Sequence, residues 1–339
     1  MNRKMNSALK FLLCLGISSL FIPKPGFSAT QADAEKDGQV TWYVAMLPTE
    51  ARDIAKEFTK EYPKIHVTYV VMRANQIPIR VTTEIRAGQA NADVVSSSAW
   101  DVSALALNHD LLKYSPPEAA NLIPAAVDKN SYWVGEFILT LPIVYNSKVL
   151  AAQGLQPPTS LQDLTSPQYK GKFSIEIDDY EWYHALVKTI GQPVLQKLAD
   201  NGPLFRDGHT TNMNGVIDGE FPISLGVFGY KAYEAKKQGF PIVLLNAYPT
   251  VAELQIVGIP KNAPHMNAAK FFENWLVSKK AQTFVEDKFL RTPTRNDVPA
   301  LTEIYDPTKT TLTYSDPNAA AQYSEYENGF NRTFHVNGQ

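Results

Sequence analysis

The stretch that decides the fold is "GEFILTLPIVYNSKVL", from Gly135 to Leu150. Its β-branched and aromatic residues stand directly before the turn-like segment Tyr145–Lys148, and this composition predicts one or two buried strands. These strands would lie near the middle of a chain of 339 residues. The fold of the whole chain has to account for so apolar a segment at this position.

Short apolar strands alternate with amphipathic helices on both sides of this segment. After "QVTWYVAM" (39–46), apolar residues recur at helical spacing, and Thr49 is the expected N-cap of that helix. The alternation predicts an α/β fold with a parallel sheet covered on both faces. The strands expected outside the central segment are 39–46, 64–72, 92–100, 172–177, 221–226, 241–246 and 254–259.

The first residues have the pattern of an export signal. Basic residues precede the apolar run "FLLCLGISSLFI" (11–22), which is too short to span a bilayer, and small residues follow at Ser28 and Ala29. We expect a signal peptide at residues 1–29 and release of the mature protein into the periplasm. An uncleaved anchor is the alternative, because Phe27 is a poor residue three positions before the cut.

The composition of the mature chain excludes some classes of partner. Removing the four basic residues of the signal takes the formal net charge from −2 to about −6. A chain this acidic, without a cluster of Lys and Arg, is a poor candidate for binding nucleic acid or an anionic membrane. The only cysteine, Cys14, lies in the apolar run. The roughly 310 remaining residues suffice for two domains of about 150 residues each.

No motif of enzymatic or metal chemistry is present. The sequence lacks a Gly-x-Ser-x-Gly elbow, a Gly-rich phosphate loop, a His-Glu-x-x-His motif and a calcium loop, and its six histidines are scattered singly. We therefore expect a protein that is not an enzyme and that holds neither a cofactor nor a metal.

Four segments resemble the recurring segments of periplasmic solute-binding proteins of ABC importers, in the group that includes the ferric-ion-binding proteins. The resemblance covers most of the mature chain in the same order, and it implies the α/β two-lobed periplasmic binding protein fold (type II-like), with crossing hinge strands and a ligand cleft between the lobes. The segments are "LTSPQYKGKFSI" (164–175), "DGEFPISLG" (218–226), "GIPKNAPHMNAAKFFENWLVSKKAQ" (258–282) and "TPTRNDV" (292–298).

This resemblance explains the central strands. It implies that the chain leaves the first lobe along 135–146, with Pro142 at the bend, and returns along 241–254; the alternative is one more interior strand. The C-terminal segment is either a docked helix or a frayed tail. The expected boundaries are 1–29 for the signal peptide, 30–141 for lobe 1, 142–246 for lobe 2, 247–300 for the return part of lobe 1 and 301–339 for the C-terminal segment.

Ligands of doubly wound sheets bind beyond the carboxyl ends of strands, beside helix N-termini. Hydroxyls, aromatic rings and charged groups at these places are candidates for ligand contacts. Helix capping, packing in the core and surface ion pairing are the respective alternatives. The candidate ligand-binding residues are Thr49, Ser97, Ser98, Trp100, Asp178, Asp179, Trp182, Arg206 as a counter-charge, and Tyr230.

The resemblance also bears on iron. Ferric-ion binders of this family use a tyrosine pair after a Gly-Glu-x-Pro strand, whereas here Gly219–Pro222 is followed at the corresponding distance by Tyr230 alone. Leu47 stands where a histidine is often found. Fe(III) prefers several anionic oxygen ligands, so loss of most of them disfavours iron. Ferric-ion binding is therefore the alternative function rather than the preferred one.

The preferred function is capture of a small polar or anionic organic solute by a monomeric protein that delivers it to an ABC permease. Polyamines are less favoured, because a cation needs a carboxylate cage for which only Asp178, Asp179 and Glu181 are evident. A sensor or chemoreceptor adaptor that binds the same ligand without transport is the alternative from another class.

Overall fold

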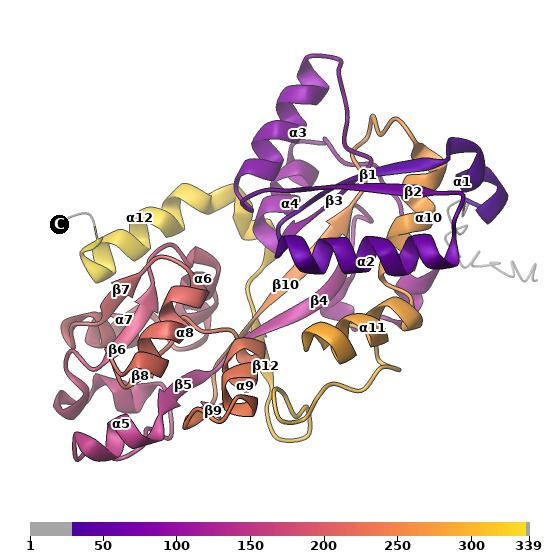
Figure 1. Cartoon of the computed structure of the whole chain (residues 1–339). Coiled ribbons are helices and arrows are strands. Elements are labelled where there is room, and N and C mark those ends of the chain that lie inside the picture. Colours follow the sequence, from indigo (N-terminus) through magenta and orange to yellow (C-terminus); the bar gives the residue numbers. More distant parts are fainter. Residues whose placement is uncertain (1–28, 337–339) are drawn as a thin grey trace, which may run out of the picture.

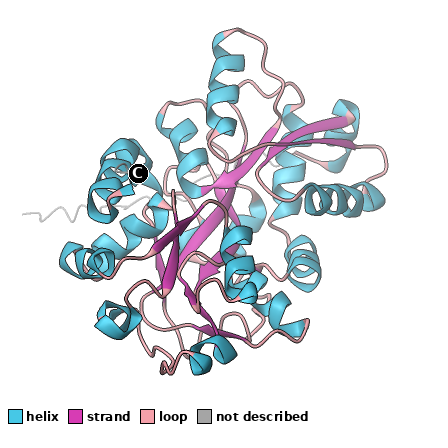
Figure 2. Ribbon diagram, turned by 60° about the vertical axis from the view of Figure 1, so that its left-hand side comes forward, coloured by secondary structure: helices cyan, strands magenta, loops and turns pink. Residues whose placement is uncertain are grey.

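The computed structural model of the protein describes residues 29–336, which form two lobes joined by crossing strands (Figure 1). Helices cover both sheets, and the strands run continuously through the waist of the molecule (Figure 2). Of the expected signal peptide, all but Ala29 lies outside the described residues. Within residues 29–336, no helix combines the length and the apolar content needed to cross a membrane.

The first lobe takes its elements from both ends of the chain. Its N-terminal part consists of α1 (Gln31–Asp37), β1 (Gln39–Val44), α2 (Pro48–Glu61), β2 (His66–Val71), α3 (Gln76–Arg86), β3 (Val94–Ser98), α4 (Ala99–Leu107) and β4 (Val134–Leu141). Its returning part consists of β10 (Thr250–Gly258), α10 (Met266–Leu276), α11 (Lys279–Phe289), β11 (Thr292–Pro293) and β12 (Leu312–Tyr314).

The sheet of the second lobe and the helices that follow its strands come from one continuous stretch of chain. Its elements are β5 (Ile143–Asn146), α5 (Ser147–Ala152), β6 (Phe173–Glu176), α6 (Tyr180–Thr189), α7 (Gln192–Asp200), β7 (Leu204–Arg206), α8 (His209–Asp218), β8 (Ile223–Ser224), α9 (Gly229–Lys237) and β9 (Ile242–Leu245). Each strand expected from the sequence coincides with an observed strand.

The sheets are mixed, which differs from the wholly parallel sheet expected from the alternation. The first sheet has the order β11-β4-β10-β3-β1-β2, with β12 beside β10, and the second has the order β7-β6-β8-β5-β9. Strands β1, β2 and β3 are parallel, whereas β10 is antiparallel to β3 and to β4. The reason is the crossing: β4 runs towards the second lobe and β10 returns from it, so the two strands pair in opposite directions.

The crossing itself takes very few residues. Pro142 alone separates β4, in the first sheet, from β5, in the second. On the return, four residues separate β9 from β10, and β10 pairs with β4 from Val251 opposite Leu141 onwards. The start of α9 packs closely on the outgoing strand, since a Cβ on Gly229 would lie 2.5 Å from Oγ1 of Thr140. Only glycine fits this approach.

An aromatic cluster holds the helices of the first lobe on its sheet. Phe272 of α10 contacts Trp42 of β1 and Phe58 of α2, with ring centroids 5.4 and 4.9 Å apart, and it stacks on Trp275. Phe58 and Phe272 are fully buried. Edge-to-face pairs of this kind add to the stabilisation from burial of apolar area.

The C-terminal segment is a docked helix, and it contacts both lobes. The 3-10 helix η5 (Pro317–Gln322) packs on α4 of the first lobe, and α12 (Tyr323–Phe334) packs on α6 and α7 of the second. Phe330 of α12 is fully buried in the core of the second lobe. Nε1 of Trp100 donates to the Asp316 carbonyl at 3.1 Å, and His184 contacts Ser315 Oγ at 3.0 Å.

We predict that Phe272→Ala lowers the free energy of unfolding by about 3 to 5 kcal/mol, because it removes a fully buried ring and leaves a cavity. Urea unfolding followed by tryptophan fluorescence measures this loss. The control is Phe240→Ala at a ring that is 38% exposed, which should cost less than about 1 kcal/mol. Equal losses in the two variants would contradict the assignment of Phe272 to the core.

Candidate functional site

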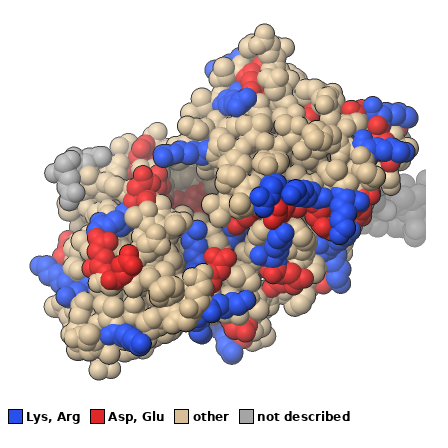
Figure 3. All heavy atoms as spheres, in the orientation of Figure 1, with Lys and Arg blue, Asp and Glu red and all other residues tan. Residues whose placement is uncertain are grey.

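A cavity of about 490 Å³ lies between the lobes, and we call it the acidic pocket. Figure 3 shows a hollow between the two lobes with acidic side chains on its inner wall. Both lobes line the pocket at the carboxyl ends of strands: β3 on one side, and β6 and β7 on the other. This is the position at which doubly wound sheets bind ligands.

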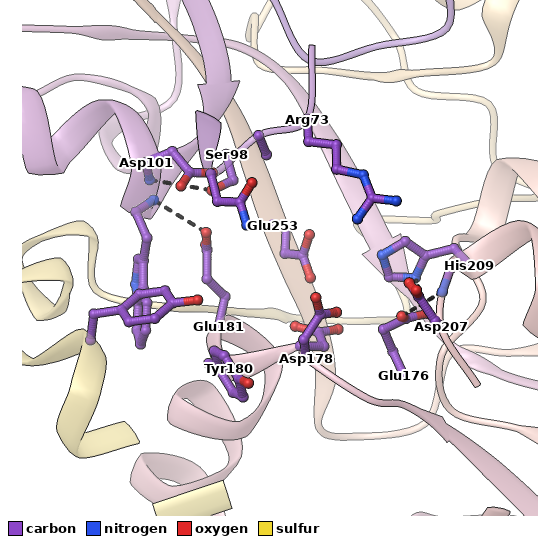
Figure 4. A pocket seen from close by; sticks show the side chains of 16 residues that line it. Arg73, Ser98, Asp101, Glu176, Asp178, Tyr180, Glu181, Asp207, His209 and Glu253 are labelled. Carbon is purple, nitrogen blue, oxygen red and sulfur yellow. Dashed lines mark hydrogen bonds and ion pairs between the residues drawn. The ribbon is translucent and has the colours of Figure 1, made fainter. Parts of the chain in front are cut away.

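Seven carboxylates line the acidic pocket and converge from four segments of the chain (Figure 4). The single basic side chain with a permanent charge among the lining residues is that of Arg73, from the loop after β2. Such a wall concentrates negative potential inside a partly enclosed space and attracts cations. The carboxylates are those of Asp101, Glu176, Asp178, Asp179, Glu181, Asp207 and Glu253.

Three of these carboxylates lie next to one another: Asp179 and Glu181 are buried, and Glu253 is partly buried. Asp179 caps α6 by accepting from the Trp182 N–H at 2.8 Å, and Glu181 accepts from the Trp100 N–H of the other lobe at 3.2 Å. Oε2 of Glu181 and Oε1 of Glu253 are buried without a hydrogen-bond partner among the described residues. Burial raises the pKa of all three groups, and the charges of Asp179 and Glu181 raise that of Glu253 further.

Glu176 closes the side of the pocket towards β7. Its carboxylate accepts from the Gly208 N–H at 2.6 Å and from Nδ2 of Asn212 at 3.0 Å. Burial, followed by the charges of the neighbouring aspartates, raises the pKa of Glu176 to about 8. Burial and Asp207 also raise the pKa of Asp178, while the charge of Arg73 acts in the opposite direction. The pocket therefore holds carboxyl groups that retain protons near neutral pH.

Aromatic rings form another wall of the acidic pocket. Tyr323, at the start of α12, contacts Tyr180 and Trp100, with ring centroids 5.5 and 6.1 Å apart. All three residues line the pocket. A cation over such rings gains a favourable interaction with their π faces in addition to its attraction to carboxylates.

A second cavity, of about 250 Å³, adjoins the first and shares Gly208 and His209 with it. We call it the basic pocket, because Lys231 and Arg291 line it. The guanidinium of Arg291 lies 3.4 Å from the centre of the Tyr230 ring and pairs with Oε1 of Glu50 at 2.6 Å. Arg291 and Glu50 are only 4% and 7% exposed.

His209 separates the two pockets and is neutral. Its Nδ1 lies 3.0 Å from the carbonyl oxygen of Gly226, which can only accept, so Nδ1 carries the proton. The imidazole packs on the Phe228 ring at 3.8 Å between centroids. Burial lowers the pKa of His209 to about 4. Its Nε2 is therefore an acceptor at neutral pH.

Five of the nine residues singled out from the sequence line these pockets. Ser98, Trp100, Asp178 and Asp179 line the acidic pocket, and Tyr230 lines the basic pocket. The expectation of both hydroxyl and carboxylate groups in the cleft therefore agrees with the geometry.

The other four residues line neither pocket. Ser97 is fully buried and contacts Asp101 at 3.3 Å. Thr49 is exposed in the first turn of α2, and its expected role as N-cap is wrong, because Leu47 occupies that position without a side-chain bond. Trp182 is buried in the core of the second lobe. Arg206 pairs with Glu220 and donates to the Phe205 carbonyl at 2.7 Å, so it is a surface ion pair rather than a counter-charge in the cleft.

Several lining residues were not predicted from the sequence, although the pattern around some of them indicates a position at the cleft. Glu176 ends a predicted strand, Asp101 follows Trp100, and Glu253 is a single carboxylate in the apolar run "TVAELQIVG". Tyr323 carried no such signal, because it comes from the C-terminal segment and reaches the pocket only through docking of α12. Among residues 29–336, no group of three or more His, Cys, Asp or Glu side chains is arranged to hold a metal ion.

The chain matches the model of the family described as bacterial extracellular solute-binding protein over residues 47–283, which is well over half of its length. It belongs to this family. It is the solute-binding component of an ABC importer, which captures a small solute outside the cytoplasmic membrane and passes it to a permease; it is not an enzyme.

Among curated proteins, the chain is 26% identical over 290 residues to a putative 2-aminoethylphosphonate-binding periplasmic protein of Salmonella paratyphi A, with 80% of each chain covered. Among solved structures, it resembles AfuA of Actinobacillus pleuropneumoniae with bound fructose-6-phosphate (TM-score 0.75, 22% identity, covering 88% of this chain and 99% of that one). It also resembles iron-bound HitA of Pseudomonas aeruginosa (TM-score 0.73, 21% identity, covering 86% and 99%). These structural likenesses establish the two-lobed fold.

We predict that Arg291→Met destabilises the protein by about 3 to 5 kcal/mol, because it leaves the Glu50 carboxylate buried without its partner. The double variant Glu50→Met with Arg291→Met should recover most of this loss, since it removes both charges. Urea unfolding of the wild-type protein and the two variants measures the effect. A double variant as unstable as the single one would show that the pairing does not account for the loss.

Proposed function

We propose that the solute carries a protonated amine, which the acidic pocket binds between the lobes. The observation that carries this proposal is the group of carboxylates Asp179, Glu181 and Glu253, in which two buried oxygens lack a hydrogen-bond partner among the described residues. Carboxylates buried without a compensating charge are costly to ionise. A bound ammonium group would supply both the opposite charge and the missing donors.

This proposal refines the class of ligand expected from the sequence. An amine is a polar organic solute, and among amines the sequence disfavoured polyamines only because too few carboxylates were evident for a cage. Glu176, Asp207, Asp101 and Glu253 complete that cage. The ligand named for the Salmonella relative, 2-aminoethylphosphonate, carries a primary amine, which supports the same class.

Each part of the pocket would have a distinct role in binding. Asp179, Glu181 and Glu253 would accept hydrogen bonds from the ammonium group, and Ser98 would offer a further polar contact. Trp100 and Tyr323 would cover the carbon atoms next to the charged nitrogen. The alternative, ferric iron, is less well supported, because the Tyr230 ring lies against the positive charge of Arg291, where a second cation would be repelled.

We further propose that binding closes the lobes about the two crossings, near Pro142 and Asn246. The hydrogen bond from Trp100 to Glu181 joins the lobes across the cleft, so a ligand held by Glu181 would favour the closed state. We also propose that the signal peptide is cleaved near Ala29 and that the mature protein is a monomer in the periplasm.

We predict that a thermal-shift screen of amines, organic acids and sugar phosphates yields a stabilising amine. For an amine found in this way, Glu181→Gln should weaken binding by about tenfold or more, because a charged hydrogen bond is worth about 1.5 to 3 kcal/mol. The control Glu303→Gln removes one negative charge at an exposed position outside the pocket and should leave the affinity unchanged.

Two outcomes would contradict the amine proposal. The first is stabilisation by acids or sugar phosphates without any amine. The second is a strong visible charge-transfer band with ferric citrate that disappears in Tyr230→Phe, which would restore the ferric-ion alternative.

We also predict that the affinity for the amine rises between about pH 6 and about pH 8. The pKa of Glu176 is raised to about 8, and those of Asp179, Glu181 and Glu253 are raised as well, so these groups lose protons across this range and become better partners for a cation. In the ligand-free protein, the same groups bind more protons when folded than when unfolded, so their contribution to stability falls as the pH rises.

Isothermal titration calorimetry across this range, in buffers of different ionisation enthalpy, measures both the affinity and the protons released. His209 is neutral throughout, because its pKa is about 4. Glu181→Gln should flatten the pH dependence. An affinity that is constant or falls with rising pH in the wild-type protein would contradict the carboxylate cage.

A further inference from the structure

One of the cationic side chains that line the basic pocket, Arg291, has an unsatisfied donor. Arg291 is 4% exposed; its Nη2 binds Glu50 and its Nη1 donates to the Phe289 carbonyl, but its buried Nε has no hydrogen-bond partner among the described residues. Lys231, on the opposite wall, donates to Oγ1 of Thr210 at 2.9 Å. A buried guanidinium N–H without an acceptor is costly, and an anionic oxygen of a ligand would satisfy it.

Two helix N-termini face the same pocket. Helices α2 and α9 begin after Leu47 and Phe228, both of which line the pocket. Neither helix has a hydrogen bond from a side-chain cap. The positive ends of the two helix dipoles therefore add to the charges of Arg291 and Lys231. Glu50 offsets one of these charges, so the pocket keeps a net positive charge.

The two pockets adjoin each other and carry opposite charge. They meet at Gly208 and His209, and the neutral imidazole between them neither repels a cation nor attracts an anion. Strand β10 contributes to both pockets: Glu253 lines the acidic pocket and Gln255 lines the basic pocket. In Figure 4, the Arg73 side chain extends towards His209, at the boundary between the two.

Building on the proposed amine site, we infer that the solute is a zwitterion with its charges at opposite ends, whose ammonium group lies in the acidic pocket and whose oxyanion lies in the basic pocket. The oxyanion is a phosphonate, a phosphate or a carboxylate, and a short carbon chain passes His209. The anionic group expected from the sequence thus has its place in the same cleft as the amine.

The charge distribution gives this arrangement its selectivity. A simple amine satisfies the carboxylates but leaves Nε of Arg291 without an acceptor, and a simple anion leaves the carboxylates without a cation. Only a ligand with an ammonium group and an oxyanion satisfies both pockets. A simple amine or a simple anion binds more weakly, because it leaves charged groups of one pocket unpaired.

Calorimetry with matched probes tests the inference on the full mature protein. The probes are ethylamine, ethylphosphonate, 2-aminoethylphosphonate and 3-aminopropionate. We expect both zwitterions to bind more tightly than ethylamine and ethylphosphonate by at least about tenfold, which corresponds to about 1.4 kcal/mol. The difference between the two zwitterions distinguishes a site for a tetrahedral oxyanion from a site for a carboxylate.

Variants in the two pockets test binding of the ammonium group and binding of the oxyanion separately. Two variants change the basic pocket: the single variant Lys231→Met, and the double variant Glu50→Met with Arg291→Met. Each should weaken binding of the preferred zwitterion by about tenfold and leave the affinity for ethylamine unchanged. Lys231 is only partly buried, so its variant should fold even where the double variant does not. Glu181→Gln should weaken both the zwitterion and ethylamine.

The outcomes distinguish this inference from the proposed function. Zwitterions that bind no more tightly than ethylamine, or a Lys231→Met variant that binds every probe as the wild-type protein does, would overturn the inference and leave the amine site standing. Binding of ethylphosphonate without any effect of an added amine would overturn the amine site. If none of the four probes binds, both proposals fail.

Discussion

The pairing of β4 with β10 is the constraint on which the rest of the structure depends. A chain that enters a second lobe midway and returns must cross twice, and here the outgoing and returning strands are hydrogen-bonded to each other from Val251 opposite Leu141 to Val257 opposite Val134. This pairing satisfies the buried backbone at the waist and places both crossings side by side. The same strands form the floor of the cleft: Glu253 faces the acidic pocket, and Phe137 and Gln255 face the basic one.

The cleft concentrates groups that are unfavourable in the ligand-free protein. Asp179 and Glu181 are buried, and Glu253 is partly buried, at the meeting point of the lobes. Protonation of these carboxyl groups relieves the repulsion between their charges. The helix cap at Asp179 and the bond from Trp100 to Glu181 already fix these two side chains, so a cation bound as proposed would find them oriented, and little ordering free energy would be lost on binding.

The sequence was sufficient for the architecture and only partly sufficient for the site. Strand and helix alternation follows from local spacing, so the strands were predictable from the residues alone. The crossing, with Pro142 at the bend, was expected only from the family resemblance. Which side of a helix faces a cleft between lobes is a tertiary property, and for this reason Ser98 and Trp100 were placed correctly while Thr49 and Trp182 were not. For Arg206 the sequence left open a counter-charge in the cleft or a surface ion pair, and its partner Glu220 lies on a segment that only the fold brings close.

The C-terminal segment adds a link between the lobes that the crossing strands alone do not provide. Its 3-10 helix rests on α4 and its final helix on α6 and α7, so any opening of the cleft must either bend this segment or separate Trp100 from Asp316. Trp100 contacts the segment, bonds to Glu181 and lines the acidic pocket at once. The charge at the site and the position of the lobes are therefore coupled through one side chain and its backbone. A ligand that holds Glu181 in place stabilises the contacts that keep the two lobes together.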